Sequence, residues 1–146
     1  MSQPLDKIDM QILEILQSNS SVSMKDIAEK VGLSITPSYE RVKSMERDGY
    51  IKKYVALVNR KKLGIYLISY CSINTNTKTK HDIEEFEKSI LILPEVIEAV
   101  STSGKYDYML KIATKDIDSY NDFLVNKLHQ LPFIAHYHSN IVLNEL

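Results

Sequence analysis

Residues 24–51 constrain the fold of this chain most, because they have the pattern of two short helices joined by a tight turn. The apolar residues of the first helix recur three, four and seven positions apart, so they share one side. They are Met24, Ile27, Ala28 and Val31. Gly32 follows directly, where a left-handed residue commonly ends a helix. A second helix is predicted shortly afterwards, with Val42 and Met45 on its buried side.

The opposite side of the second helix carries small hydroxyl groups at its beginning and cations one and two turns later. With the residues that start the helix, the candidates for DNA binding are Ser34, Thr36, Pro37, Ser38, Tyr39, Arg41, Lys43 and Arg47. A helix in the DNA major groove uses such groups, because its first residues approach base edges, hydroxyls bind phosphates and Arg can bond guanine. The alternative is a helical hairpin with a solvated charged face, since Glu40, Glu46 and Asp48 dilute the positive charge. The pattern favours DNA binding.

The distribution of charge separates the two halves of the chain, although the net charge of all 146 residues is only −1. Residues 1–62 carry 11 Lys and Arg against 8 Asp and Glu, a balance of +3. Residues 63–146 carry 7 against 11, a balance of −4. A basic first half beside an acidic second half indicates that only the first half meets phosphate. The polar segment 59–64 lies between them, so we expect two domains, 1–62 and 63–146.

The first domain is predicted to contain one more helix and a strand. Residues 5–18 have an apolar stripe formed by Ile8, Ile12, Ile15 and Leu16. Residues 51–58 are rich in β-branched and aromatic residues, which predicts a strand that serves as a wing or as a connector. Lys52 and Lys53 at its start either touch phosphate or only keep an edge strand soluble, and the sequence favours neither interpretation.

The second domain is predicted to alternate strands and helices. Strands are expected at residues 66–74, 96–102, 106–114 and 134–143, and helices at 81–93 and from Asp116 or Asp118 onward. This βαββαβ order is that of the ferredoxin-like fold, an antiparallel sheet with helices on one face. The fold class is therefore α+β, with an N-terminal winged helix-turn-helix domain and a C-terminal ferredoxin-like domain. The other face of the sheet carries Tyr, Met, Ile and Val residues, which predicts an oligomer interface.

Composition and spacing give little support for catalysis. Cys71 is the only cysteine, so no internal disulfide is possible, and its apolar surroundings favour a core role over that of a nucleophile. His136 and His138 have a spacing that can bind a metal, but exposed strand histidines are favoured because no third ligand is near in sequence. The sequence has no Gly-rich phosphate loop and no zinc-binding spacing. We expect no enzyme and no cofactor or metal. Without a signal segment or membrane span, we expect a cytoplasmic protein.

Residues 101–108 form the remaining candidate for a binding site. A tight turn at Gly104 exposes backbone N–H groups, which can hold a carboxylate, and Asp107 just beyond it can hold an ammonium group. A turn that offers both groups suits a free amino acid. The alternative, which the residues alone favour, is an ordinary hairpin with a solvated Asp.

A pattern of four segments covers nearly the whole chain, from Leu5 to about Leu143: LDKIDMQIL, DIAEKVGLS, ERVKSMERDGYIKKYVALVN and SGKYDYMLKI. It resembles the Lrp/AsnC family of bacterial and archaeal transcription factors. The resemblance implies a helix-turn-helix head, a linking strand and a ferredoxin-like domain that dimerises and binds amino acids at interfaces between dimers. It also implies that Thr36, Ser38, Tyr39 and Arg41 face bases or phosphate.

The resemblance further assigns the residues of the effector site. The family's Gly-x-x-Asp-Tyr turn is matched by Gly104, Asp107 and Tyr108, and a threonine of its last strand by Ser139, which keeps the hydroxyl. With their neighbours, the effector-binding candidates are Ser103, Gly104, Tyr106, Asp107, Tyr108 and Ser139. His136 and Tyr137 stand where family members often have Arg and Thr, a difference that bears on ligand choice or assembly.

We predict a sequence-specific DNA-binding transcriptional regulator whose assembly or DNA affinity is modulated by a small effector, an amino acid. Its expected partners are a pseudo-palindromic site in double-stranded DNA and further copies of the chain, in a homodimer that assembles to a tetramer or octamer. The alternative is a metabolite-binding assembly module whose helical head binds protein instead of DNA, which the modest positive charge of the head suggests. Salt dependence separates the two, because phosphate contacts make affinity fall steeply with salt.

Overall fold

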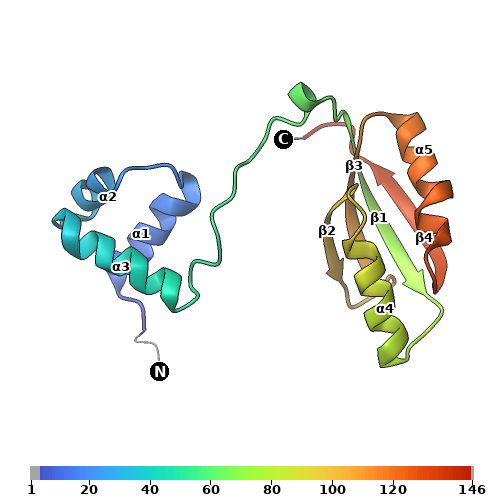
Figure 1. Cartoon of the computed structure of the whole chain (residues 1–146), viewed down its shortest axis with the longest axis horizontal. Coiled ribbons are helices and arrows are strands. Elements are labelled where there is room, and N and C mark those ends of the chain that lie inside the picture. Colours follow the sequence, from blue (N-terminus) through green and yellow to red (C-terminus); the bar gives the residue numbers. More distant parts are fainter. Residues whose placement is uncertain (1–3, 146) are drawn as a thin grey trace. The chain divides into compact units, whose positions relative to one another are not determined.

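Two compact units, Met1–Leu57 and Val58–Leu146, make up the chain in the computed structural model, which describes residues 4–145 (Figure 1). The first unit is helical, and the second holds the sheet. The units separate within the segment that follows the third helix, a few residues before the boundary expected from the polar segment 59–64.

The helical unit consists of α1 (Lys7–Ser18), α2 (Met24–Val31) and α3 (Ile35–Arg47). Local capping sets their ends: Asp6 and Ser23 accept backbone N–H groups at the starts of α1 and α2, and Gly32 ends α2 with a φ of 71°. The three helices enclose a small apolar core formed by Ile12, Ile27, Val42 and Met45. The predicted helix-turn-helix is confirmed, and α3 keeps its outer side free of this core.

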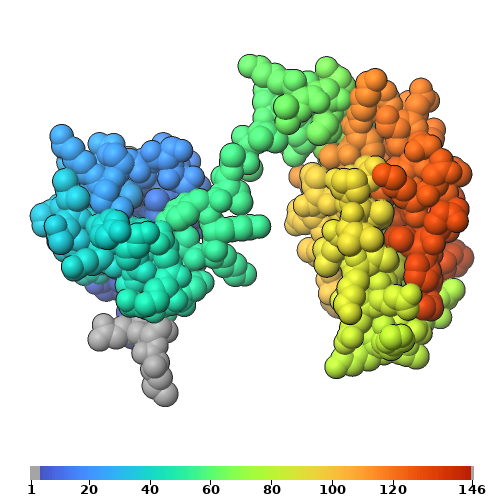
Figure 2. Space-filling view, in the orientation of Figure 1, coloured from blue at the N-terminus to red at the C-terminus, as the bar shows by residue number. Residues whose placement is uncertain are grey.

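The predicted strand at residues 51–58 is wrong. The segment is extended but belongs to no helix or strand, and across residues 4–145 no strand pairs with it. β-branched residues favour a pleated backbone, but a strand is formed only when a neighbour supplies hydrogen bonds. Ile51 packs against the core of the helical unit, but the later apolar side chains project into solvent, with Leu57 97% exposed. Figure 2 shows the segment as a thin thread of teal and green atoms.

The second unit is a four-stranded antiparallel sheet in the order β2-β3-β1-β4. The strands are β1 (Leu67–Thr75), β2 (Val96–Ser101), β3 (Tyr108–Thr114) and β4 (Ile134–Ile141). The helices α4 (Lys80–Leu91) and α5 (Ile117–Asn126) follow β1 and β3, and the short turns η1 (Lys61–Leu63) and η2 (Leu128–Gln130) complete the unit. The predicted βαββαβ order and ferredoxin-like fold are confirmed. None of the helices in the described part of the chain is both long and apolar enough to cross a membrane.

One face of the sheet packs against α4 and α5 in a large apolar core. Its fully buried members include Cys71, Ile73, Phe86, Ile90, Leu110, Ile112, Tyr120, Phe123 and Leu128. Cys71 is thereby confirmed as a core residue. Alternate residues point to the opposite face. There Tyr70, Val100 and Met109 are partly exposed, and the Lys111 ammonium lies 5.6 Å from the centre of the Tyr70 ring.

Candidate functional site

The start of α3 offers unshielded polar groups. Ser34 holds the N-cap position, yet its side chain makes no capping hydrogen bond, and Thr36 beside it is exposed. Pro37 is partly buried within the first turn, where its missing N–H costs nothing. The exposed side chain of Ile35, which carries no polar group and was therefore not a sequence-based candidate, completes this end. The free N–H groups of a helix start attract anions, so this end can receive a phosphate.

Tyr39 and Lys43 lie one turn apart on the exposed side of α3. The Lys43 ammonium is 5.5 Å from the centre of the Tyr39 ring and 2.7 Å from a carboxylate oxygen of Glu46. The other Glu46 oxygen accepts a hydrogen bond of 2.9 Å from the hydroxyl of Tyr54, in the segment after the helix. The Glu46 contact raises the pKa of Lys43, and the contacts to Lys43 and Tyr54 lower the pKa of Glu46. Sequence reasoning named Glu46 only as a residue that dilutes the positive charge and missed its contacts to Lys43 and Tyr54, although the three-residue spacing of Lys43 and Glu46 was visible.

Arg47 ends the exposed side of α3. Its guanidinium bonds the Ser44 hydroxyl at 3.0 Å and the Asp48 carboxylate at 3.3 Å. The side chain remains 73% exposed, so these contacts leave most of it to solvent. Arg47 and Lys43 are thus the exposed cations of this face, and each is paired with one carboxylate.

Ser38 does not belong to the exposed set, and the prediction that it faces DNA is corrected. Its relative exposure is 0%, and its hydroxyl donates to the backbone oxygen of Ser34 at 2.9 Å. Ser38 shares a helix side with Val42 and Met45, four and seven positions later, and these residues build the core. The backbone bond satisfies the hydroxyl, so a serine is tolerated there.

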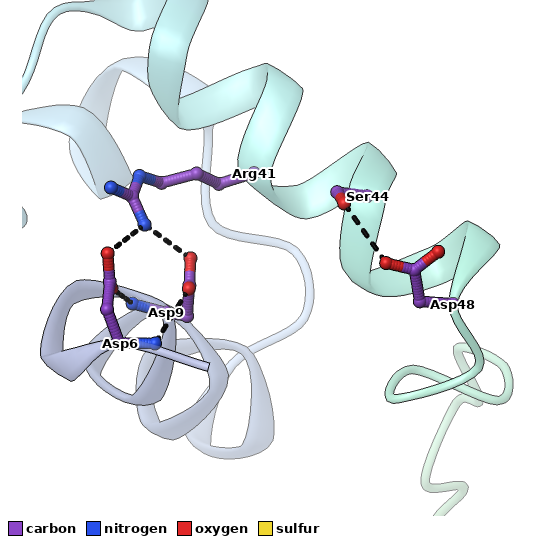
Figure 3. Close-up of polar contacts among 5 residues, drawn as sticks. All are labelled: Asp6, Asp9, Arg41, Ser44 and Asp48. Carbon is purple, nitrogen blue, oxygen red and sulfur yellow. Dashed lines mark hydrogen bonds and ion pairs between the residues drawn. The ribbon is translucent and has the colours of Figure 1, made fainter. Parts of the chain in front are cut away.

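Arg41, which is predicted to face bases or phosphate, turns its side chain toward α1 in this structure. One guanidinium nitrogen, Nη1, lies 2.7 Å from a carboxylate oxygen of Asp6 and 2.7 Å from one of Asp9 (Figure 3). This double contact raises the pKa of Arg41. The pKa of Asp6 is lowered, first by the backbone N–H of Asp9 and then by Arg41. Arg41 therefore joins two helices in this structure.

The turn between β2 and β3 is held by a hydrogen bond of its own and by one from β1. The N–H of Thr102 donates to the backbone oxygen of Asp107 at 2.8 Å, and the side-chain amide of Asn74 donates to that of Lys105 at 2.8 Å. Gly104 has a φ of 148°, a conformation that favours glycine. Within residues 4–145, the N–H groups of 103–106 have no acceptor, so the turn presents a row of free donors.

Asp107 is exposed and fixed beside this row. One of its oxygens, Oδ2, accepts the backbone N–H of Thr75 at 2.8 Å and faces the Thr75 hydroxyl at 3.2 Å. The ring of Tyr106 stacks on His138, with centres 6.5 Å apart. Ser103, Gly104, Tyr106 and Asp107 therefore belong to one feature, the turn of residues 102–107.

Tyr108 and Ser139 have partners away from this turn, on the helix-covered side of the sheet. Tyr108 donates to Glu87 at 3.0 Å, and burial with that contact raises its pKa to about 12. The hydroxyl of Ser139 accepts from Tyr120 at 2.6 Å and lies 3.9 Å from the Cys71 sulfur. Burial raises the pKa of Cys71 to about 11, so its thiol stays protonated near neutral pH. The structure does not bring Ser139 into the turn.

His136 and His138 are exposed on β4, in agreement with the favoured interpretation as exposed strand histidines. In the part of the chain that the structure describes, the one group of three side chains with metal-ligand spacing is His81, Asp82 and Glu85. Asp82 in this group already accepts from the hydroxyl of Thr77 at 2.7 Å.

Both units match known families of domains. Residues 5–52 match a family described as winged helix-turn-helix DNA-binding, and residues 69–146 match the Lrp/AsnC ligand binding domain. Transcriptional regulator AzlB of Bacillus subtilis is 36% identical over 96% of this chain and 89% of its own length. The leucine-responsive regulatory protein of Escherichia coli K12 is 34% identical over 97% and 87%, respectively.

Solved structures agree with these matches. An AsnC family transcriptional regulator from Agrobacterium tumefaciens has a TM-score of 0.91 at 32% identity, covering 97% of this chain and 92% of its own. A transcriptional regulator of Neisseria meningitidis, solved as a complex with L-Met, has a TM-score of 0.93 at 29% identity, covering 98% and 92%.

Proposed function

This chain belongs to the Lrp/AsnC family of DNA-binding transcriptional regulators, and we propose that α3 reads its operator while the turn 102–107 takes an amino-acid effector. The observation that carries the proposal is the exposed side of α3, on a three-helix head with a helix-turn-helix arrangement. We further propose that the protein acts in the cytoplasm, as a regulator rather than an enzyme.

DNA is held by the exposed residues of α3 in this proposal. Thr36 and Tyr39 approach base edges near the helix start, where free N–H groups face the phosphate backbone. Lys43 and Arg47 follow one and two turns later and neutralise phosphates, once they leave Glu46 and Asp48. Two protomers present two such helices, so the site is pseudo-palindromic, with half-sites about one helical turn or a multiple of it apart.

The effector is held by the free N–H groups of residues 103–106 and by Asp107. A row of N–H groups binds a carboxylate, and the second Asp107 oxygen, Oδ1, can accept from an ammonium group. The N–H donors and the Asp107 carboxylate thus match the carboxylate and the ammonium group of a free amino acid. The L-Met complex of the Neisseria meningitidis regulator is consistent with an amino acid as ligand.

Effector and DNA are coupled through assembly. The exposed Tyr70, Val100 and Met109 lie on the open face of the sheet, which packs against a second copy to form the homodimer. Dimers then assemble to tetramers or octamers, and the effector favours one assembly over another. A coupling free energy of about 1–3 kcal/mol suffices for such a switch.

The test is fluorescence anisotropy with a DNA fragment from upstream of the protein's own gene, in several salt concentrations, with and without a mixture of amino acids. We expect tight binding to this fragment, weaker binding to a shuffled fragment of equal length, and an altered affinity when the mixture is present. The absence of binding at low salt would refute DNA recognition.

Asp107→Asn tests the effector site. Asn retains an oxygen for the Thr75 N–H and removes the negative charge, so the turn keeps its shape. We expect normal DNA binding without a response to the mixture. An unchanged response would exclude Asp107 as the ammonium ligand and leave DNA recognition intact.

A further inference from the structure

Arg41 completes a closed set of contacts at the start of α1. In the capping box of this helix, the Asp6 N–H donates to Oδ2 of Asp9 at 3.0 Å, and the Asp9 N–H donates to Oδ1 of Asp6 at 2.9 Å. Nη1 of Arg41 binds the two remaining oxygens, each at 2.7 Å (Figure 3). Every carboxylate oxygen of the capping box is therefore engaged, and the engaging cation belongs to another helix.

The contact also stands out among the ion pairs of α3. Lys43 and Arg47 pair with carboxylates on or next to α3 itself, so those pairs do not connect elements. Arg41 reaches residues 32 and 35 positions earlier in the sequence. The Asp9 side chain is only 14% exposed and that of Arg41 31%, so water screens this pair less than it screens a fully exposed one.

We propose that Arg41 is a positioning residue, which fixes the rotation of α3 against α1 and acts on DNA only through the exposed side chains that α3 presents. To bind a phosphate through Nη1, Arg41 would have to release the carboxylates of Asp6 and Asp9. These two negative charges would then lie close together without a cation. This inference rests on the proposed DNA-binding function and deepens it, because it assigns a different role to the cation that the sequence pattern offered as a base reader.

Positioning and direct contact predict opposite signs for one variant. Asp6→Asn combined with Asp9→Asn keeps acceptors for the capping box but removes the charges that hold Arg41. If Arg41 contacted DNA, two lost negative charges and a freed guanidinium would tighten binding. If Arg41 positions α3, the same variant loosens the packing of α3 against α1 and weakens DNA binding.

The experiment compares DNA affinity and its salt dependence for the wild type, Arg41→Ala, the double Asn variant and Arg47→Ala. We expect Arg41→Ala and the double variant each to weaken specific binding on the order of tenfold, as for a lost charge-assisted hydrogen bond, with an unchanged salt slope. Arg47→Ala is the matched control, and its slope is expected to fall by about 0.9 because a phosphate contact is lost. A similar fall for Arg41→Ala, or tighter binding by the double variant, would overturn the proposal.

Amide hydrogen exchange of the DNA-free protein separates this inference from the proposed function. We expect Arg41→Ala and the double variant to speed exchange in α1 and α3, whereas Arg47→Ala leaves it unchanged; a folded far-UV circular dichroism spectrum shows that the variants retain their helices. If the wild type failed to bind DNA, the proposed function would fail. Faster amide exchange in Arg41→Ala would still support the positioning role of Arg41. Unchanged amide exchange in Arg41→Ala would overturn the positioning role, whatever the result of the DNA-binding measurement.

Discussion

The two units of this chain stabilise themselves in different ways. The helical unit has a small core around Ile12, Ile27, Val42 and Met45, and its tertiary polar contacts include a charged, partly exposed one from Arg41 to Asp6 and Asp9. The sheet unit has a larger core rich in aromatic rings, and its tertiary polar contacts include buried hydroxyl groups. A small core leaves more of the stability to surface contacts, which respond to pH and salt.

This contrast has a functional consequence. A head that reads DNA must carry charged side chains at its surface, and the same charges are available to fix its helices. In the proposed function the sheet unit keeps its shape while its assembly changes, and a packed core suits that role. The head is therefore expected to respond to solution conditions, and the sheet to substitutions in its core.

The largest effect is expected from Phe86→Ala. Phe86 is fully buried and packs edge-on against Tyr108, with the two ring centres 5.1 Å apart. Its removal should lower the free energy of unfolding by about 3–5 kcal/mol. Cys71, the only thiol, is 0% exposed and reports opening of the sheet unit. We expect the labelling rate of Cys71 by a thiol reagent to rise roughly 100-fold or more. An unchanged rate would show that the core does not control this opening.

Met45→Ala is the counterpart in the helical unit, with an expected cost of about 2–3 kcal/mol, at the lower end for such substitutions because the core is small. Amide exchange should become faster in α1, α2 and α3. Labelling of Cys71 should stay at the wild-type rate if the two units open independently. Faster labelling would instead show that the two units open together and are not stabilised independently.

A smaller effect is expected from Asp6→Asn, and it depends on pH. The pKa of Asp6 is lowered in the folded chain, so its stabilising contribution is present above the ordinary value of about 3.9 and is lost as the pH falls through the folded value. The wild type should be more stable than the variant at pH 7, and the difference should shrink toward pH 3. Urea unfolding at both values, followed by far-UV circular dichroism, measures it. An equal difference in the free energy of unfolding at pH 7 and pH 3 would mean that the charge of Asp6 does not stabilise the fold.

The smallest effect is expected from Glu46→Gln. Gln keeps an acceptor for the Tyr54 hydroxyl but releases Lys43 for phosphate. We expect DNA affinity to rise about threefold, as for a surface pair worth less than 1 kcal/mol, in the anisotropy assay. Weaker binding would mean that Glu46 orders the DNA-binding side of α3, and the surface charges of the head would then be structural.

The helices and the sheet order could be predicted from the sequence because the signals are local. Apolar spacing and capping residues such as Ser23 and Gly32 define α2, and alternation with turn residues defines the strands. The segment 51–58 shows the limit, because its residues favour a strand but pairing depends on a neighbour that local sequence does not specify. β3 begins at Tyr108 because residues 106 and 107 are used in the turn.

The faces of α3 were harder to predict than its existence. Ser38 and Arg41 are polar, so both were assigned to the exposed side, and the structure turns one into the core and the other toward α1. The spacing of Ser38 with Val42 and Met45 was a usable signal for the burial of Ser38. The direction of Arg41 could not be predicted, because it depends on Asp6 and Asp9 lying opposite Arg41 once the helices have packed. In the same way, the Ser139 hydroxyl faces α5 because of the position of Tyr120.

The hydroxyl contacts beneath α5 also specify how β4 aligns with β1. Tyr120 accepts from Ser69 at 3.0 Å and donates to Ser139, which lies opposite Cys71. A slip of one residue would place His138 or Asn140 beneath the helix, and a slip of two would place Tyr137 or Ile141 there. None of these matches the small hydroxyl that Tyr120 requires. The three hydroxyl groups of Ser69, Tyr120 and Ser139 therefore favour the observed register of β4 against β1.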